Sequence, residues 1–209
     1  MISFGIDPSG SENRRTGISI IDDDLLARTW ITYTDEDIVN AVKGAEPDVV
    51  AIDAPLSLPK GRCCANQSCL CSSYGIVRST DKAISVMGYH PFWTLLPSMV
   101  NLTIRSIRLK ESIQLMGIKV IEVYPGAAQD RLGISRKKAG IEKLENGLKA
   151  LGIHLIDQVH RRVHDELDAV TAAYIGLCYL KGKFEAAGPS DEIQIILPLV
   201  NSLNLKPQR

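Results

Sequence analysis

Five acidic residues stand where the chain changes from one local pattern to another. Asp7 and Asp53 each close a short apolar segment, and Glu122 lies inside a third such segment. Asp165 and Asp168 stand at the start of a long apolar, helix-like segment. Carboxylates that converge from separate segments can hold Mg²⁺ or Mn²⁺, because these hard ions prefer oxygen ligands. Two such ions, about 3.5–4 Å apart, suit the hydrolysis of phosphodiester bonds. We therefore take all five acids as candidate catalytic residues, and Asp7, Asp53, Glu122 and Asp168 as candidate Mg²⁺ or Mn²⁺ ligands.

Each acid also has a structural interpretation. Asp7 precedes Pro-Ser-Gly and could make an Asx-turn, and Asp53 precedes Ala-Pro and could simply end a strand. Asp165 and Asp168 could cap a helix, where carboxylates meet unpaired N–H groups and the positive end of the dipole. Glu122 is harder to explain in this way, since a charge within a buried strand needs a partner.

Four cysteines lie within nine positions, at Cys63, Cys64, Cys69 and Cys71. Four thiols in one loop could bind Zn²⁺ tetrahedrally, although the repeated C-x-x-C spacing of a zinc ribbon is absent. Adjacent cysteines are also poor geometry for two ligands of one small ion. Reduced thiols without a metal, or disulfides in an oxidising cytosol, are the alternatives.

The segments that must position these residues follow a mixed α/β pattern. Residues 2–7, 16–21 and 26–33 predict three antiparallel strands, and residues 34–44 predict a helix with Thr34 as its N-cap. The apolar runs 49–53 and 119–123 predict buried strands, and 192–197 predicts a final one. Helices are predicted within 95–116, 137–151 and 164–180, and residues 57–82 are expected to be loop-like.

Composition and charge limit the class of protein. The chain has 209 residues, 45% of them hydrophobic, which predicts one folded domain over 1–209 with an insertion at about 57–117. No apolar stretch approaches the roughly 20 residues that span a bilayer, and no secretory signal is evident, so we expect no membrane partner and a cytoplasmic location. Basic and acidic residues number 24 each, which gives no bulk attraction to nucleic acid. The surplus of bases after residue 60 would favour a polyanion there, and the basic residues Arg136, Lys137 and Lys138 could contact phosphates.

Several segments, in order along the chain, resemble the predicted RNase H-like nuclease family catalogued as a domain of unknown function. The matching stretches are residues 5–7, 52–59, 78–81, 120–127 and 165–169. The resemblance implies an RNase H-like α/β fold: a mixed sheet with antiparallel first three strands and then parallel strands, flanked by helices. It also implies that Asp7, Asp53, Glu122 and the Asp165/Asp168 pair face one metal site.

The leading hypothesis is a metal-dependent nuclease or phosphodiesterase that acts on nucleic acid with carboxylate-held divalent ions. Two alternatives remain open. The glycine turn after Asp7 resembles the first phosphate loop of actin-like and sugar-kinase-like phosphotransferases, which generally duplicate the domain over a longer chain. A catalytically silent nucleic-acid-binding domain is the other, because a fold does not fix a function. The sequence does not indicate the oligomeric state or the choice between RNA and DNA.

Overall fold

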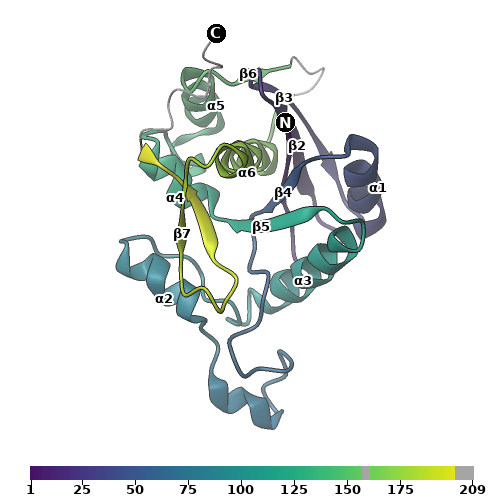
Figure 1. Cartoon of the computed structure of the whole chain (residues 1–209), viewed down its shortest axis with the longest axis vertical. Helices are drawn as coiled ribbons and strands as arrows, with labels where there is room; N and C mark the ends of the chain where they lie inside the picture. The colour runs from purple at the N-terminus through teal and green to yellow at the C-terminus, as the bar shows by residue number, and fades with distance from the viewer. Residues whose placement is uncertain (157–160, 201–209) are drawn as a thin grey trace.

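The computed structural model of the chain describes residues 1–156 and 161–200. The centre of this part is an eight-stranded mixed sheet with the order β6-β3-β2-β1-β4-β5-β8-β7 (Figure 1). Its strands are β1 (Ile2–Asp7), β2 (Thr16–Asp22), β3 (Leu26–Thr32), β4 (Val49–Ile52), β5 (Lys119–Val123), β6 (His154–Leu155), β7 (Phe184–Ala187) and β8 (Ile195–Pro198).

The strand directions confirm the predicted fold class. β1, β2 and β3 form an antiparallel meander, whereas β4, β5 and β8 continue from β1 as parallel neighbours. Two edge strands were not predicted from the sequence: β6 pairs with β3, and β7 pairs antiparallel with β8. Both are short, and each depends on a partner strand distant in the sequence or on a turn without a strong signal.

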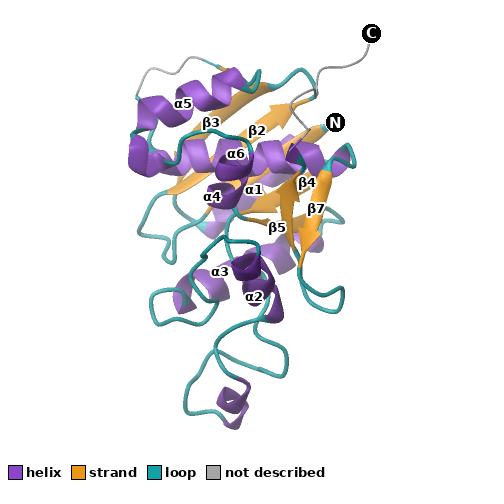
Figure 2. Ribbon diagram, turned by 90° about the vertical axis from the view of Figure 1, so that its left-hand side faces the viewer, coloured by secondary structure: helices purple, strands orange, loops and turns teal. Residues whose placement is uncertain are grey.

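Helices cover both faces of the sheet (Figures 1 and 2). The helices of the described residues are α1 (Asp35–Ala45), η1 (Leu70–Tyr74), α2 (Ser79–Val86), α3 (Val100–Gln114), α4 (Pro125–Arg131), η2 (Lys137–Ala139), α5 (Ile141–Ala150) and α6 (His164–Leu180), where η marks a 3₁₀ helix; η1 lies in a segment that extends away from the sheet. As predicted, Thr34 caps α1, its Oγ1 accepting a hydrogen bond of 3.1 Å from the Asp37 amide. Residues 57–82 are less irregular than expected, because they contain η1 and the start of α2. Among the described residues, no helix combines the length and apolar character needed to cross a membrane.

Alternation along β1 divides the core into two layers. Phe4 and Ile6 point to the face covered by α1 and α3, where they pack with apolar side chains of both helices. Ser3 and Gly5 point to the other face, against α6. α6 lies between the sheet and the helices α4 and α5, so it is buried over most of its length (Figure 2).

Candidate active site

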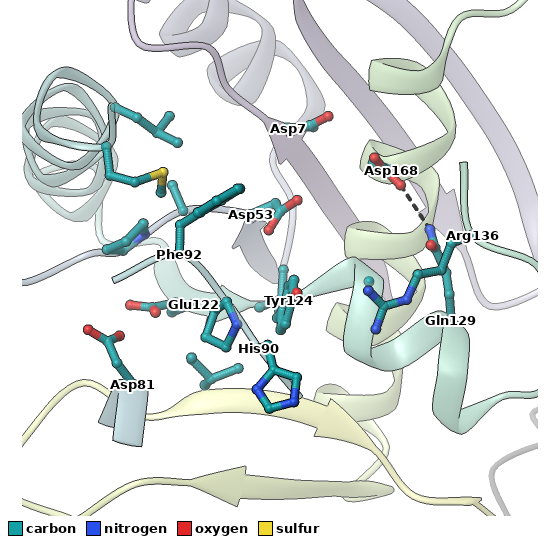
Figure 3. Close-up of a pocket in the computed structure, with 18 of the residues that line it drawn as sticks. Asp7, Asp53, Asp81, His90, Phe92, Glu122, Tyr124, Gln129, Arg136 and Asp168 are labelled. Atoms are coloured by element: carbon teal, nitrogen blue, oxygen red, sulfur yellow. Dashed lines mark hydrogen bonds between the residues drawn. The ribbon is translucent and has the colours of Figure 1, made fainter. Parts of the chain in front are cut away.

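A pocket of about 340 Å³ lies at the end of the sheet where β1 and β4 terminate. Four of the five predicted acids line it: Asp7, Asp53, Glu122 and Asp168. Asp7, Asp53 and Asp168 surround one side of the pocket, and Glu122 lies near Asp81 on the other (Figure 3). Asp7 ends β1, Asp53 follows β4, Glu122 lies within β5 and Asp168 lies on α6. Tertiary structure is therefore needed to bring the four acids together.

Parallel pairing explains why Asp7 and Asp53 are neighbours. Ile6 of β1 is in register with Ile52 of β4, so the residue that follows each lies at the same edge of the sheet. The Asp53 amide donates a 2.9 Å hydrogen bond to the Ile6 carbonyl, which continues the ladder one residue further. The two carboxylates are thereby attached to adjacent, rigid backbone positions.

Asp168 reaches the same place because α6 lies unusually close to β1 and β2. A Cβ atom at Gly5 would lie 2.1 Å from the Ala169 carbonyl oxygen, and one at Gly17 would lie 2.0 Å from the Asp165 carbonyl oxygen. Only glycine permits such an approach. The first turns of α6 therefore rest on the two strands, and the Asp168 side chain lies at the end of β1.

Two side chains hold the Asp168 carboxylate. Gln129 of α4 donates a hydrogen bond of 2.8 Å to Oδ1 (Figure 3), and Lys137 of η2 forms an ion pair of 2.9 Å with Oδ2. Lys137 was expected only as a phosphate contact, and Gln129 was not singled out. Neither position carries a signal in the sequence, since their role depends on how α4 and η2 pack against α6.

Burial and, after it, mutual repulsion raise the pKa values of the acids in the pocket. Burial, followed by the negative charge of Asp168, raises the pKa of Asp53 to about 8. Burial, followed by the charges of Asp53 and Asp168, raises the pKa of Asp7 well above its usual range. Burial disfavours the charged form of Lys137, but attraction to Asp168, and then to Asp7 and Asp53, raises the pKa of this lysine. The site therefore favours the protonated forms of Asp53 and Asp7 and the charged form of Lys137.

Glu122 is held in a separate buried network. Arg78 donates to both of its oxygens, at 2.6 and 2.7 Å, and the Leu56 amide donates to Oε2 at 2.8 Å. Arg78 also pairs with Asp81 at 2.8 Å, and Thr94 donates to that aspartate. Arg78 and the Leu56 amide thus compensate the charge of Glu122 inside β5. Both oxygens of Glu122 have cationic or N–H partners in this structure.

Asp165 is placed outside the pocket. Its carboxylate lies 3.9 Å from Nε of Arg15 and lines a different surface hollow, with Ser9 and Tyr33 among the neighbours. Only a minor contribution to the raised pKa of Asp7 links it to the acids. Of the 165/168 pair, Asp168 therefore lies in the pocket with Asp7 and Asp53, and Asp165 does not.

Basic and aromatic residues complete the pocket. Arg136, Lys137 and Lys138 line it together with His90 and Phe92. The Phe92 side chain is 71% exposed, so its ring is available to a ligand at the mouth. Arg136 forms an ion pair with Asp130, and Lys138 is a basic lining residue with no acidic partner among the residues that the structure describes.

The four cysteines converge away from this pocket. Their Sγ atoms all lie within 4.8 Å of one another, despite the unfavourable spacing in the sequence. Among the described residues, no other group of three or more Cys, His, Asp or Glu side chains brings its potential ligand atoms this close together.

Comparisons with known proteins concern the fold. No family model matches the chain, and no curated protein matches it. Two solved structures of Thermus thermophilus RuvC are similar, each with a TM-score of 0.49 over 90% of this chain and 99% of the RuvC chain. Their sequences are 14% and 15% identical to it, and the first is in complex with a Holliday junction substrate.

Proposed function

We propose that the protein is a metal-dependent hydrolase of phosphodiester bonds in nucleic acid. The observation that carries this proposal is the convergence of Asp7, Asp53 and Asp168 on one pocket at the end of the sheet. The chain as a whole is then one RNase H-like domain, in which residues of about 57–117 form an insertion beside that pocket.

The three carboxylates fit Mg²⁺ or Mn²⁺ by charge and by donor type. All three offer oxygen ligands, which hard divalent cations prefer. Burial, and then repulsion among these acids, raises the pKa of Asp7 and Asp53, and Lys137 is the cation that lowers both pKa values. A divalent ion would relieve that repulsion. When bound, such an ion supplies a nucleophilic water at neutral pH and stabilises the leaving oxygen.

The remaining pocket residues have roles that follow from their contacts. Asp7 and Asp53 would hold the ion from the sheet, and Asp168 would do so from α6, oriented by Gln129. Lys137 and Lys138 would bind the phosphate groups of the substrate, where cations position the backbone without reading its sequence. We assign Glu122 a positioning role, because it fixes Arg78 and the Leu56 amide beside the pocket.

Phe92 supports a nucleic-acid substrate. An exposed aromatic ring beside basic residues can stack on a nucleobase, and such stacking is worth about 1–3 kcal/mol per base. Its position at the pocket, next to His90, would place a base near the acids while Lys138 contacts the backbone.

The test is cleavage by purified protein in Mg²⁺ or Mn²⁺ of single-stranded, duplex and branched DNA and RNA. The Asp7→Asn variant keeps the shape of the side chain and should lose activity by on the order of 100-fold or more, because a ligand charge is removed. Asp165→Asn is the matched control on the same end of the molecule and should cleave at the wild-type rate.

Other outcomes identify the alternatives. Turnover of ATP with small acceptors and no strand cleavage would indicate a phosphotransferase. Salt-sensitive binding of nucleic acid without turnover would indicate a binding domain. Full cleavage by Asp7→Asn would contradict the assigned site.

A further inference from the structure

The segment between β4 and α2 contains a cluster of four cysteine thiols, whereas the potential metal ligands of the pocket are carboxylates. This segment, residues 57–77, extends away from the sheet (Figures 1 and 2) and is called the lobe below. It contains Cys63, Cys64, Cys69 and Cys71, none of which is in a disulfide.

The thiol geometry is that of four ligands around one small ion. The Sγ atoms of Cys63 and Cys69 are 3.8 Å apart, and those of Cys64 and Cys71 are also 3.8 Å apart. In a tetrahedral site with Zn–S bonds of about 2.3 Å, the edge of the sulfur tetrahedron is about 3.8 Å. All four Sγ atoms lie within 4.8 Å of one another, so one ion can reach each of them after small side-chain adjustments.

The lobe has little else to hold it together. Leu70 is 95% exposed and Tyr74 is 62% exposed, so the apolar side chains of η1 do not form a core. Small units that cannot bury enough apolar surface commonly depend on a bound metal or on disulfides. An ion coordinated tetrahedrally by the four thiols would link the beginning of the loop 63–71 to its end.

A buried cation lies beside the thiols. Arg62 is 7% exposed, and it donates through Nε to the Cys64 carbonyl at 3.0 Å. Its Nη1 is buried and has no hydrogen-bond partner among the described residues. Four thiolates around a divalent ion carry a net charge of minus two, so the guanidinium of Arg62 would offset part of that charge. A buried cation with an unpaired N–H donor destabilises the folded state, and a neighbouring anionic cluster would offset that destabilisation.

We propose that Cys63, Cys64, Cys69 and Cys71 bind one Zn²⁺ ion as a structural site. Four sulfur ligands select a borderline-soft ion and exclude Mg²⁺, and they leave no open position for a reacting water. The site is independent of the carboxylate pocket and of the activity proposed for that pocket.

The lobe that would hold the ion is anchored at both of its ends. The Leu56 amide precedes the lobe and Arg78 follows it, and both donate to Glu122. The lobe is therefore a loop whose two ends meet at one carboxylate. Zn²⁺ in the loop restricts the chain between these anchors, so loss of the ion should increase hydrogen exchange in residues 57–77 while the sheet remains protected.

The test uses the whole protein, purified without affinity metals. We expect one Zn²⁺ per chain, and after replacement by Co²⁺ the visible absorption bands of a tetrahedral thiolate complex. The four thiols should resist alkylation until Zn²⁺ is chelated. Cys69→Ser should weaken Zn²⁺ binding by on the order of 100-fold. Cys178→Ala, which alters a buried cysteine in α6, is the matched control and should retain the ion.

Two results would overturn the proposal. One is a native protein whose mass shows two disulfides among the four cysteines. The other is a wild-type protein whose four thiols react freely in the presence of added Zn²⁺ and that gives no Co²⁺ thiolate spectrum. Both are measured on the wild-type chain, so they remain decisive if Cys69→Ser does not fold.

Discussion

Binding of Mg²⁺ at the carboxylate pocket should release a proton, and the amount follows from Asp53. The pKa of this residue is raised to about 8, so at pH 7 it is mainly protonated. An ion that uses the carboxylate must displace that proton. A single group with this pKa releases about 0.9 proton at pH 7 and about 0.1 at pH 9. The apparent affinity should rise about tenfold per pH unit below pH 8 and level off above it.

Calorimetry measures this release directly. Mg²⁺ is titrated into metal-free protein in buffers of different ionisation enthalpy, and the slope of apparent enthalpy against buffer enthalpy gives the number of protons released. Asp53→Asn, which cannot ionise, should lose most of the release and most of the pH dependence. Mg²⁺ binding with no buffer dependence at pH 7, or unchanged release by Asp53→Asn, would refute the assignment of Asp53 as a ligand with a raised pKa.

Three further changes test the framework around the pocket. Arg78→Met should lower the free energy of unfolding by about 3–5 kcal/mol, because it leaves two buried carboxylates without their cation; a loss below 1 kcal/mol in urea denaturation would contradict this. Gly5→Ala should cost at least about 2 kcal/mol, because the added Cβ would lie 2.1 Å from a carbonyl oxygen of α6. Gly44→Ala, where nothing lies within 4 Å, is its control and should be neutral or slightly stabilising. Lys137→Met should tighten Mg²⁺ binding several-fold in the same calorimetry, since the ammonium no longer competes for Asp168; weaker binding would indicate that the lysine supports the ion instead.

Local sequence patterns were sufficient for the strands that carry two of the acids. An apolar run ended by an acid and a turn signal placed Asp7 and Asp53 at strand ends, and parallel pairing brings such ends to one edge of the sheet. The helix predicted for residues 164–180 has those bounds in the structure, because its apolar run is long and is preceded by a polar segment. These features depend on neighbours in the sequence, which is why the sequence alone could predict them.

The partners of the acids could not be predicted in the same way. Glu122 was recognised as a charge that needs a partner, but that partner, Arg78, is 44 positions away in the sequence. Lys137 lies in a short 3₁₀ helix that periodicity does not reveal, and Gln129 is on a helix of seven residues. Both reach Asp168 only after α4 and η2 have packed against α6. The electrostatic character of the pocket is therefore a tertiary property, although its acids are visible in the sequence.

The position of Asp168 is determined by backbone packing more than by its own hydrogen bonds. Gly5 and Gly17 let the backbone of α6 rest on the strands, and at Gly176 an added Cβ would lie 2.0 Å from Oγ of Ser3. Because these contacts occur along most of α6, the helix cannot move outward to separate Asp168 from Asp7 without losing its burial against the sheet. The acids therefore stay together in a buried place, and burial, followed by their mutual repulsion, raises the pKa of Asp7 and Asp53. A divalent cation that enters the pocket stabilises the ionised carboxylates that burial and repulsion disfavour, and a pocket held rigidly by the core binds the ion without rearrangement.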